Sequence, residues 1–348
     1  MPPTPLTPPT PSPFAAQYRK YFLARVARIY PLHVVGLVLA AVLTRVGWLP
    51  FVLEQTFHLP KNTTNATPVC GFLAQLLLLQ AWFPAGLTYV LYMYNAVTWS
   101  LSAEMFFYAA FPFICFLMHK ARRLKTGLAI VYCSITTVAV MHVSKASPDD
   151  KLRHTLFKYW FGYIFPLVRL AEFVVGMCSY FWYKKLKVCF SDARNSTVFS
   201  AVFEVVPLGI ALASVVAAIT LKVTPWVRYS LWYLPASVCI IVGYAQNGPI
   251  ATTILSHPWL VFHGETSFAF YLFHYMCLSL IVTHVHASIY ALVALAYAAS
   301  SVVAYIAFRC VETPGRKKIR DVLTCFNAAA QPQPGAKHDK TLLEVSVS

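Results

Sequence analysis

Acidic residues are scarce in this sequence: 12 aspartates and glutamates stand among 348 residues, and all charged residues together make up 11%. Soluble proteins carry roughly a quarter charged residues, so this scarcity excludes an ordinary soluble domain. The chain is also 58% hydrophobic, with a mean hydropathy of +0.60. These values predict an all-α protein, a polytopic transmembrane helix bundle with about 8–9 membrane segments.

Metal and cofactor motifs are also missing. The nine cysteines contain no CxxC pair and no spacing that binds zinc or haem, so they are interpreted as small buried hydrophobic residues. The sequence has no Walker or Rossmann glycine pattern and no repeat period. We therefore expect no metal site and no permanently bound cofactor.

Positive charge is the exception, with 28 lysines and arginines and a formal net charge of +16. The bases cluster in short runs beside apolar stretches, which is the positive-inside pattern of membrane proteins rather than a nucleic-acid surface. The rule places both termini in the cytosol. The apolar run 71–83 is shorter than the roughly 20 residues of a crossing helix. We expect it to dip without crossing, or to cross only together with the aromatic residues of segment 89–94, because a full crossing of the run alone would put the later basic loops on the wrong side.

The sequence predicts a disordered Pro-rich tail over residues 1–17, a transmembrane domain over 18–320 and a disordered tail over 321–348. Apart from the run just described, the predicted spans cover residues 31–46, 97–118, 126–143, 159–183, 200–221, 231–246, 267–285 and 289–308.

Three glycosylation sequons bear on the location of the protein. Those at Asn62 and Asn65 favour a lumenal or extracellular loop, and the one at Asn195 falls on the predicted cytosolic side, where it should go unused. The sequons and the lack of a mitochondrial presequence favour a multi-pass protein of the secretory pathway or the plasma membrane.

The most informative stretch is WSLSAEMFFYAAFP, residues 99–112. Its polar residues Ser100, Glu104 and Tyr108 follow one another at i, i+4 and share one helical face. Pro112 predicts a kink just beyond the acid. A carboxylate at membrane depth costs roughly 3 kcal/mol or more, so Glu104 should face a protein interior or a wet cavity. It is either a structural acid with a polar partner or part of a site.

Two more polar groups lie within predicted spans. Arg169 and Glu172 are three residues apart, and they form either a structural ion pair or one in which Arg169 helps to hold an anionic ligand. Ser267, Tyr271 and His274 follow at i, i+4 and i+7 and are expected on one face. They are either hydrogen-bonded core residues or part of a site.

Arg25 and Arg28 stand on one face at the start of the first span. Two arginines there suit phosphate binding through charge-assisted hydrogen bonds, but such bases also occur simply as cytosolic anchors. Glu204 lies in an apolar span without a partner in register and is interpreted as structural or as placed at the membrane boundary.

Taken together, these stretches resemble the acyltransferase 3 family of integral membrane acyltransferases. The stretches that carry the resemblance are RVARIYPLH (25–33), TWSLSAEMFFYAAFP (98–112), RLAEFVVGM (169–177), GETSFAFYLFHY (264–275) and VETPGRKKIR (311–320). The resemblance implies a multi-helix bundle that transfers an acyl group from cytosolic acyl-CoA to a hydroxyl on a sugar, glycan or lipid. It also implies that Arg25 and Arg28 bind the phosphates of CoA.

With the residue patterns, the resemblance gives a set of expected site residues. Glu104 and His274 are the catalytic candidates, and Arg25, Arg28 and Arg169 are the candidates for binding the donor. The supporting residues are Trp99, Ser100, Ser102, Tyr108, Glu172, Ser267 and Tyr271.

The chain departs from the family at its beginning, because family members start with two further spans that carry an arginine and a catalytic histidine. This sequence starts at the Arg-x-x-Arg element, so the family's base has no counterpart in it, and His33 fits the family pattern without being catalytic. Two other functions stay open. One is a protein that binds acyl-CoA or lipid without turnover, and the other is a transporter using Glu104, Arg169 and Glu172.

Overall fold

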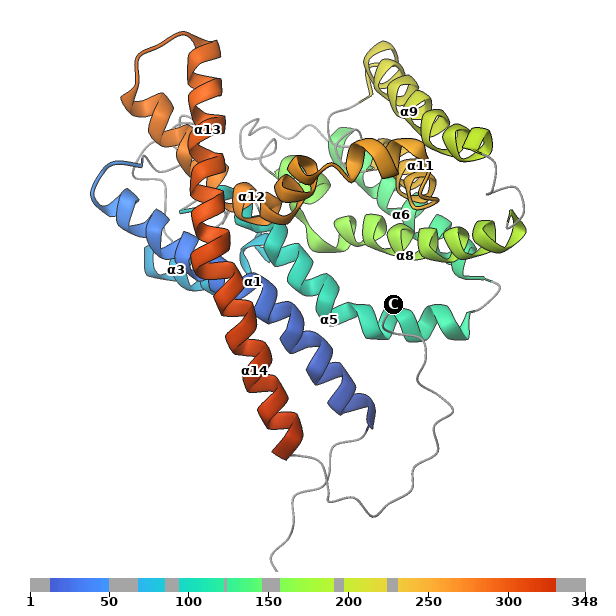
Figure 1. Cartoon of the computed structure of the whole chain (residues 1–348), viewed down its shortest axis with the longest axis horizontal. Coiled ribbons are helices and arrows are strands. Elements are labelled where there is room, and N and C mark those ends of the chain that lie inside the picture. Colours follow the sequence, from blue (N-terminus) through green and yellow to red (C-terminus); the bar gives the residue numbers. More distant parts are fainter. Residues whose placement is uncertain are drawn as a thin grey trace, which may run out of the picture.

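The computed structural model describes residues 13–49, 68–84, 94–121, 124–145, 157–190, 197–223 and 231–329. The ordered elements within these ranges are helices (Figure 1). The α-helices are α1 (Pro13–Arg45), α3 (Pro68–Leu76), α5 (Trp99–Lys120), α6 (Lys125–Lys145), α8 (Pro166–Cys189), α9 (Thr197–Thr220), α11 (Leu234–Tyr244), α12 (Pro258–His284), α13 (Ile289–Ala307) and α14 (Thr313–Ala329). Short turns of other helix types are η1 (Gln80–Trp82), η3 (Ala96–Thr98), η4 (Trp160–Ile164), η7 (Ala251–Leu255) and η8 (Phe308–Glu312).

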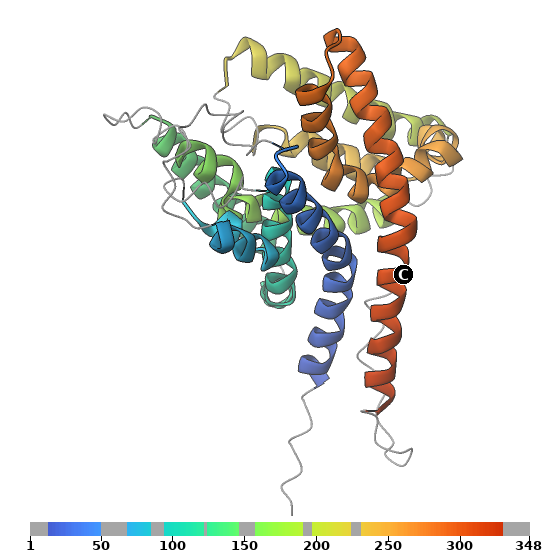
Figure 2. The same cartoon turned by 90° about the vertical axis from the view of Figure 1, so that its left-hand side faces the viewer.

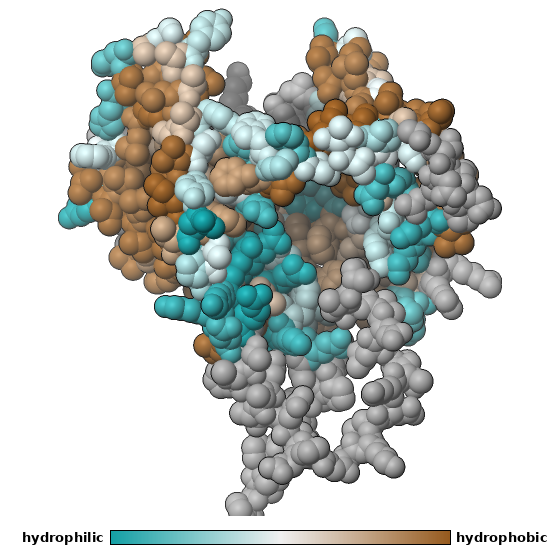
Figure 3. All heavy atoms as spheres, in the orientation of Figure 1, coloured by the Kyte–Doolittle hydropathy of each residue, from teal (hydrophilic) through white to brown (hydrophobic). Residues whose placement is uncertain are grey.

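Within the described part of the chain, seven stretches of helix are long and apolar enough to cross a membrane, which confirms the polytopic bundle. They cover Gln17–Arg45, Ala96–Lys120, Lys125–Val143, Phe157–Cys189, Val198–Thr220, Pro258–His284 and Ile289–Val322. Large apolar side chains are exposed along them, and Figure 3 shows such a hydrophobic surface over α12 and α13. This surface is suited to contact with lipid.

Two predicted segments are shorter than a crossing helix. The apolar run 71–83 folds as α3, nine residues long, followed by the turn η1, so it does not form a spanning helix. The prediction of a span over residues 231–246 is wrong in length. There α11 has 11 residues, and at 1.5 Å per residue it is about 16 Å long, against a hydrocarbon core of about 30 Å.

Proline affects two other predicted spans in opposite ways. Pro31 was expected to open the first span, but it lies inside α1, which is helical from Pro13 onwards. The span predicted over 159–183 is instead divided: η4 ends at an extended Phe165, and α8 then begins at Pro166. A residue before proline is pushed out of the α region and proline suits the first helical turn, which explains the break. Figure 1 shows α5, which contains Pro112, changing direction along its length.

The largest core cluster lies where α1, α5, α12 and the α13–α14 region meet. Figures 1 and 2 show α1 and α14 side by side, with the start of α1 and the end of α14 at the same end of the bundle. Gly315 permits their close approach, because a Cβ atom there would lie 2.8 Å from Cβ of Pro31. Two termini on one side of the membrane require this arrangement; which side it is stays a prediction.

The helices extend beyond the predicted domain at both ends. Helix α1 begins at Pro13, inside the predicted N-terminal tail, and α14 continues to Ala329. The prediction of a disordered tail from residue 321 is therefore wrong for residues 321–329. The three sequons lie outside the described residues.

Helix α11 packs against α9 by close backbone contact. A Cβ atom on Gly243 would lie 2.1 Å from the carbonyl oxygen of Phe203. Glu204 is the next residue of α9 after Phe203. Its fully buried carboxylate accepts hydrogen bonds from the backbone N–H groups of Ile250 and Ala251, both at 2.8 Å. These groups open the helical segment that follows Gly248, where a carboxylate is stabilised. Glu204 is thus structural, as predicted, but its partners are backbone groups far along the chain.

Candidate functional site

A pair of hydroxyls joins α5 to α12. The Oγ atom of Ser100 lies 2.7 Å from the hydroxyl oxygen of Tyr271. Both hydroxyls also lie within hydrogen-bond distance of the Val97 carbonyl oxygen, at 3.1 Å for Ser100 and 2.9 Å for Tyr271. The start of α5 is thereby fixed against the middle of α12, although the two hydroxyl residues are 171 positions apart.

One turn further along α5, Glu104 and its partner Tyr108 lie near a cation of α1. The Tyr108 hydroxyl donates a hydrogen bond to Oε1 of Glu104, as their i, i+4 spacing predicts. The guanidinium carbon of Arg25 lies 5.4 Å from the centroid of the Tyr108 ring, within the range of a cation–π interaction. Arg28, which is exposed, also acts electrostatically on the Tyr108 hydroxyl. The Arg-x-x-Arg element and the acid of α5 are thus neighbours.

The ion pair of α8 lies beside the same region. Arg169 forms the predicted ion pair with Glu172, and the Arg169 side chain is only 16% exposed. Its guanidinium carbon lies 5.6 Å from the centroid of the Trp99 ring and 5.0 Å from that of the Tyr163 ring. The charges of Arg169 and Glu104 both act on the Tyr271 hydroxyl. The pair is therefore real, and Arg169 contributes its charge to the same site as Tyr271.

These residues form what we call the polar cluster, drawn from four helices that the sequence separates widely. Its members are Arg25, Ser100, Glu104, Tyr108, Arg169, Glu172 and Tyr271. The cluster combines carboxylates, guanidinium groups and hydroxyls, so it can accept a proton and can donate hydrogen bonds to a developing negative charge.

The structure does not bring the whole predicted face of α12 into this cluster. Ser267 is exposed, and its hydroxyl donates to the Gly264 carbonyl of its own helix at 2.7 Å. His274 has its Nδ1 atom 2.7 Å from the Tyr271 carbonyl oxygen, and its ring stacks on Phe270. Ser267 therefore lies outside the cluster although it is one turn from Tyr271 on the same helix, and His274 is held by groups of α12 itself.

A buried hydrogen-bond network lies beside the cluster and ties the short segment 68–84 into the bundle. Ser102, a predicted supporting residue, donates to the Leu78 carbonyl oxygen at 2.6 Å. Gln80 donates from Nε2 to the Thr98 carbonyl oxygen at 2.8 Å, and Asn95 donates from Nδ2 to the Leu272 carbonyl oxygen at 3.0 Å. Buried polar side chains need such partners, so the network fixes the segment in place.

Sequence reasoning missed most of this network. The available signal was the pair of glutamines in the apolar run GFLAQLLLLQAW, because an amide there must find partners inside the protein. Both Gln75 and Gln80 are fully buried, and so is His33, whose Nε2 lies 2.9 Å from the Gln75 carbonyl oxygen. Among the described residues, His33 Nδ1 has no hydrogen-bond partner. His33 therefore belongs to this network rather than to the polar cluster.

A second acid at the α1–α14 contact was also missed. Glu312 is 1% exposed and forms an ion pair with Arg316, one turn later on α14. The charge of Arg28 on α1 also acts on Glu312. The i, i+4 spacing in VETPGRKK predicts the pair, but the approach of Arg28 depends on how α1 and α14 pack.

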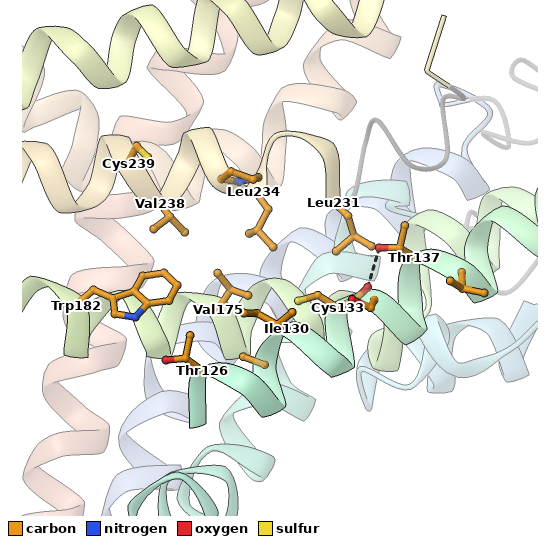
Figure 4. A pocket seen from close by; sticks show the side chains of 14 residues that line it. Thr126, Ile130, Cys133, Thr137, Val175, Trp182, Leu231, Leu234, Val238 and Cys239 are labelled. Atoms are coloured by element: carbon orange, nitrogen blue, oxygen red, sulfur yellow. Dashed lines mark hydrogen bonds between the residues drawn. The ribbon is translucent and has the colours of Figure 1, made fainter. Parts of the chain in front are cut away.

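Apolar space lies on the other side of the bundle. A cavity of about 750 Å³ lies between α6, α8 and α11 (Figure 4), and one of about 440 Å³ lies between α8, α9 and α11. Trp182, Val238 and Cys239 line both. The few hydroxyls in the larger cavity include Thr137, which donates to the Cys133 carbonyl oxygen of its own helix at 2.7 Å. Both cavities are thus suited to hydrocarbon rather than to a polar molecule.

Comparison with known proteins adds a family to this geometry. The model of the acyltransferase 3 family, described as an acyltransferase domain, matches residues 14–310. Acyltransferase MdmB from Streptomyces mycarofaciens is 29% identical over 262 residues, which are 74% of this chain and 60% of MdmB. The chain therefore spans less than two thirds of the length of that relative. No solved structure matches the chain.

Proposed function

The chain belongs to the acyltransferase 3 family, and we propose that it transfers an acyl group from acyl-CoA to a hydroxyl of a sugar, glycan or lipid at the membrane. The observation that carries the proposal is the contact between α1 and α5. Arg25 lies over the ring of Tyr108, and the hydroxyl of that tyrosine is bonded to Glu104. A cation for a phosphate and a carboxylate for a proton are thus adjacent at one site.

The negative charge of the donor supports this proposal. CoA is a polyanion, and arginine binds phosphate oxygens through paired N–H donors. Arg28 is exposed and Arg25 is partly buried, so Arg28 can reach a ligand while Arg25 is held by its aromatic neighbours. This end of α1 would then face the cytosol, where acyl-CoA is found.

The reaction needs one base and one place for negative charge. Glu104 would accept the proton of the acceptor hydroxyl, whose oxygen then attacks the thioester carbonyl carbon. The tetrahedral intermediate carries its charge on the former carbonyl oxygen, to which the hydroxyls of Ser100 and Tyr271 would donate. Its collapse breaks the carbon–sulfur bond and releases CoA thiolate, which leaves an ester on the acceptor.

Release of the CoA thiol tests this proposal. The full chain, purified in detergent, is mixed with acyl-CoA and a hydroxyl acceptor, and free thiol is measured with a colour reagent. We expect thiol release that falls at least tenfold in the Arg25→Ala/Arg28→Ala variant. The matched control is Lys184→Ala/Lys185→Ala, which removes the same charge from exposed positions of α8. No release by the unmodified chain with any acceptor would overturn the proposal.

The second candidate is a protein that binds acyl-CoA without turnover. The positions of two histidines favour it: His33 is fully buried, and His274 is held by the Tyr271 carbonyl of its own helix. Transfer then depends on Glu104 alone as the base. Binding of acyl-CoA without thiol release would distinguish this function from catalysis.

A further inference from the structure

Helices α1 and α14 form the basic end of the bundle. The contact of Gly315 with Pro31 brings the two backbones together, and the helices continue side by side beyond it (Figures 1 and 2). Figure 3 shows hydrophilic residues gathered over this part of the molecule. Arg316 of α14 forms an ion pair with the buried acid Glu312, and the charge of Arg28 on α1 also acts on that acid.

This charge group is not satisfied within itself. Arg316 donates from one Nη atom to Oε1 of Glu312, but its buried Nε–H has no hydrogen-bond partner among the described residues. The second carboxylate oxygen, Oε2, likewise has no partner there. An N–H group left without an acceptor costs about 1–3 kcal/mol, and more when it is charged. The guanidinium of Arg316 is thus held in place with a donor still to be used.

We propose that Arg316 of α14, oriented by Glu312, is a phosphate-binding residue that completes the anion site begun by Arg28 of α1. The inference rests on the proposed function, which places the phosphates of CoA at Arg28. The ligand chemistry is a phosphate group on a larger molecule. Glu312 does not touch that ligand and acts as a positioning residue.

Charge and exposure support this role. Arg316 is paired with Glu312 and the charge of Arg28 acts on the same carboxylate, so two positive charges are set against one negative charge. The side chain of Arg316 is 39% exposed while that of Glu312 is 1% exposed, so the acid holds the arginine from within and the guanidinium reaches solvent. A phosphate oxygen could accept from the exposed part of the guanidinium, whose planar set of donors arginine offers and lysine does not.

The ion pair of α8 differs from this one. Arg169 has one carboxylate partner, is 16% exposed and lies over two aromatic rings. Simple cytosolic anchoring does not explain Glu312 either, because an anchor such as the exposed Lys317 needs no buried acid to orient it.

Titration with CoA tests the proposal on the full chain in detergent. We expect Arg316→Ala to weaken CoA binding at least tenfold, which is about 1.4 kcal/mol. The matched control Lys317→Ala removes the same charge one position away and should change the affinity less than about threefold. Equal effects of the two variants would overturn this inference and leave the proposed function standing. A wild-type chain that does not bind CoA would overturn both.

Two further measurements separate phosphate binding from folding and from lipid binding. Arg316→Ala leaves a buried acid unpaired, so the variant Glu312→Gln/Arg316→Gln, with no net charge change at the pair, must show the same loss of CoA binding. Pantetheine, which lacks phosphate, should bind wild type and both variants equally. If the loss appears only with vesicles of anionic phospholipid and not with CoA, the ligand is a lipid headgroup and the assignment to CoA is wrong.

Discussion

The start of α5 is joined to α12 by hydrogen bonds from side chains to groups far away in the sequence, whereas α9 and α11 meet backbone to backbone at a glycine. In the first region Asn95 and Tyr271 link the start of α5 to α12. In the second, the Gly243–Phe203 contact leaves no room for a side chain. We call these the polar region and the apolar region.

The difference distinguishes the region that can support a reaction from the region that contains the cavities. Directional hydrogen bonds fix the polar region. A catalytic site needs such fixed donors at the position where charge develops in the transition state. Close packing fixes the apolar region only where α9 meets α11, and the two cavities lie beside that contact. Substitutions that remove a polar atom should therefore damage the first region, and substitutions that add volume should damage the second.

The largest expected effect is on turnover in the polar region. Glu104→Gln keeps an acceptor for the Tyr108 hydroxyl but cannot take a proton, so acyl transfer should fall at least 100-fold while thermal stability changes little. Thiol release from acyl-CoA measures the effect. Glu265→Gln, on an exposed position of α12, is the control and should keep full activity. Wild-type activity in Glu104→Gln would remove Glu104 from the mechanism.

The next effect is on stability in the apolar region. Gly243→Ala places a methyl group against the Phe203 carbonyl, and the helices must separate, at a cost of about 2 kcal/mol or more. Thermal unfolding in detergent measures it. Gly209→Ala is the matched control on α9, since nothing lies within 4 Å of its added Cβ, and a helical alanine should be neutral or stabilising there. If both variants unfold alike, close packing does not hold α9 to α11.

The smallest expected effects are on stability, and they come from one substitution in the polar region and one in the apolar region. Gln80→Met keeps the length of a buried side chain but removes its hydrogen bond to Thr98, and should cost about 1 kcal/mol. Val238→Thr adds a hydroxyl to the cavity wall, where it can donate to its own helix as Thr137 does, and should cost less than about 0.5 kcal/mol. Unfolding temperatures measure both. A larger loss for Val238→Thr would contradict the division into two regions.

Much of the fold can be predicted from the sequence, because long apolar helices are recognisable from their composition. The errors have physical causes. Hydropathy over 231–246 does not mark where a helix ends, so it predicts a helix longer than the 11 residues of α11. Phe165–Pro166 did carry a readable signal, since proline restricts the residue before it, and the helix breaks there.

The candidate site was predictable only where its contacts are local. The i, i+4 spacing gives Glu104 with Tyr108, and the i, i+3 spacing gives Arg169 with Glu172. Periodicity says nothing about which helix lies opposite, so the contact of Ser100 with Tyr271 could not be derived. The same limit placed Ser267 in the site, although that face of α12 passes out of the cluster.

The contact between Ser100 and Tyr271 has one more consequence. Two hydroxyl groups carry two protons, but they share three close contacts with each other and with the Val97 carbonyl. Either Ser100 donates to Tyr271, which donates to the carbonyl, or the order is reversed. The two states differ only in the direction of a short chain of O–H dipoles. Both protons are engaged in either state, so one hydroxyl must turn away from its present acceptor to donate to a new negative charge, and either hydroxyl can do so without moving a heavy atom.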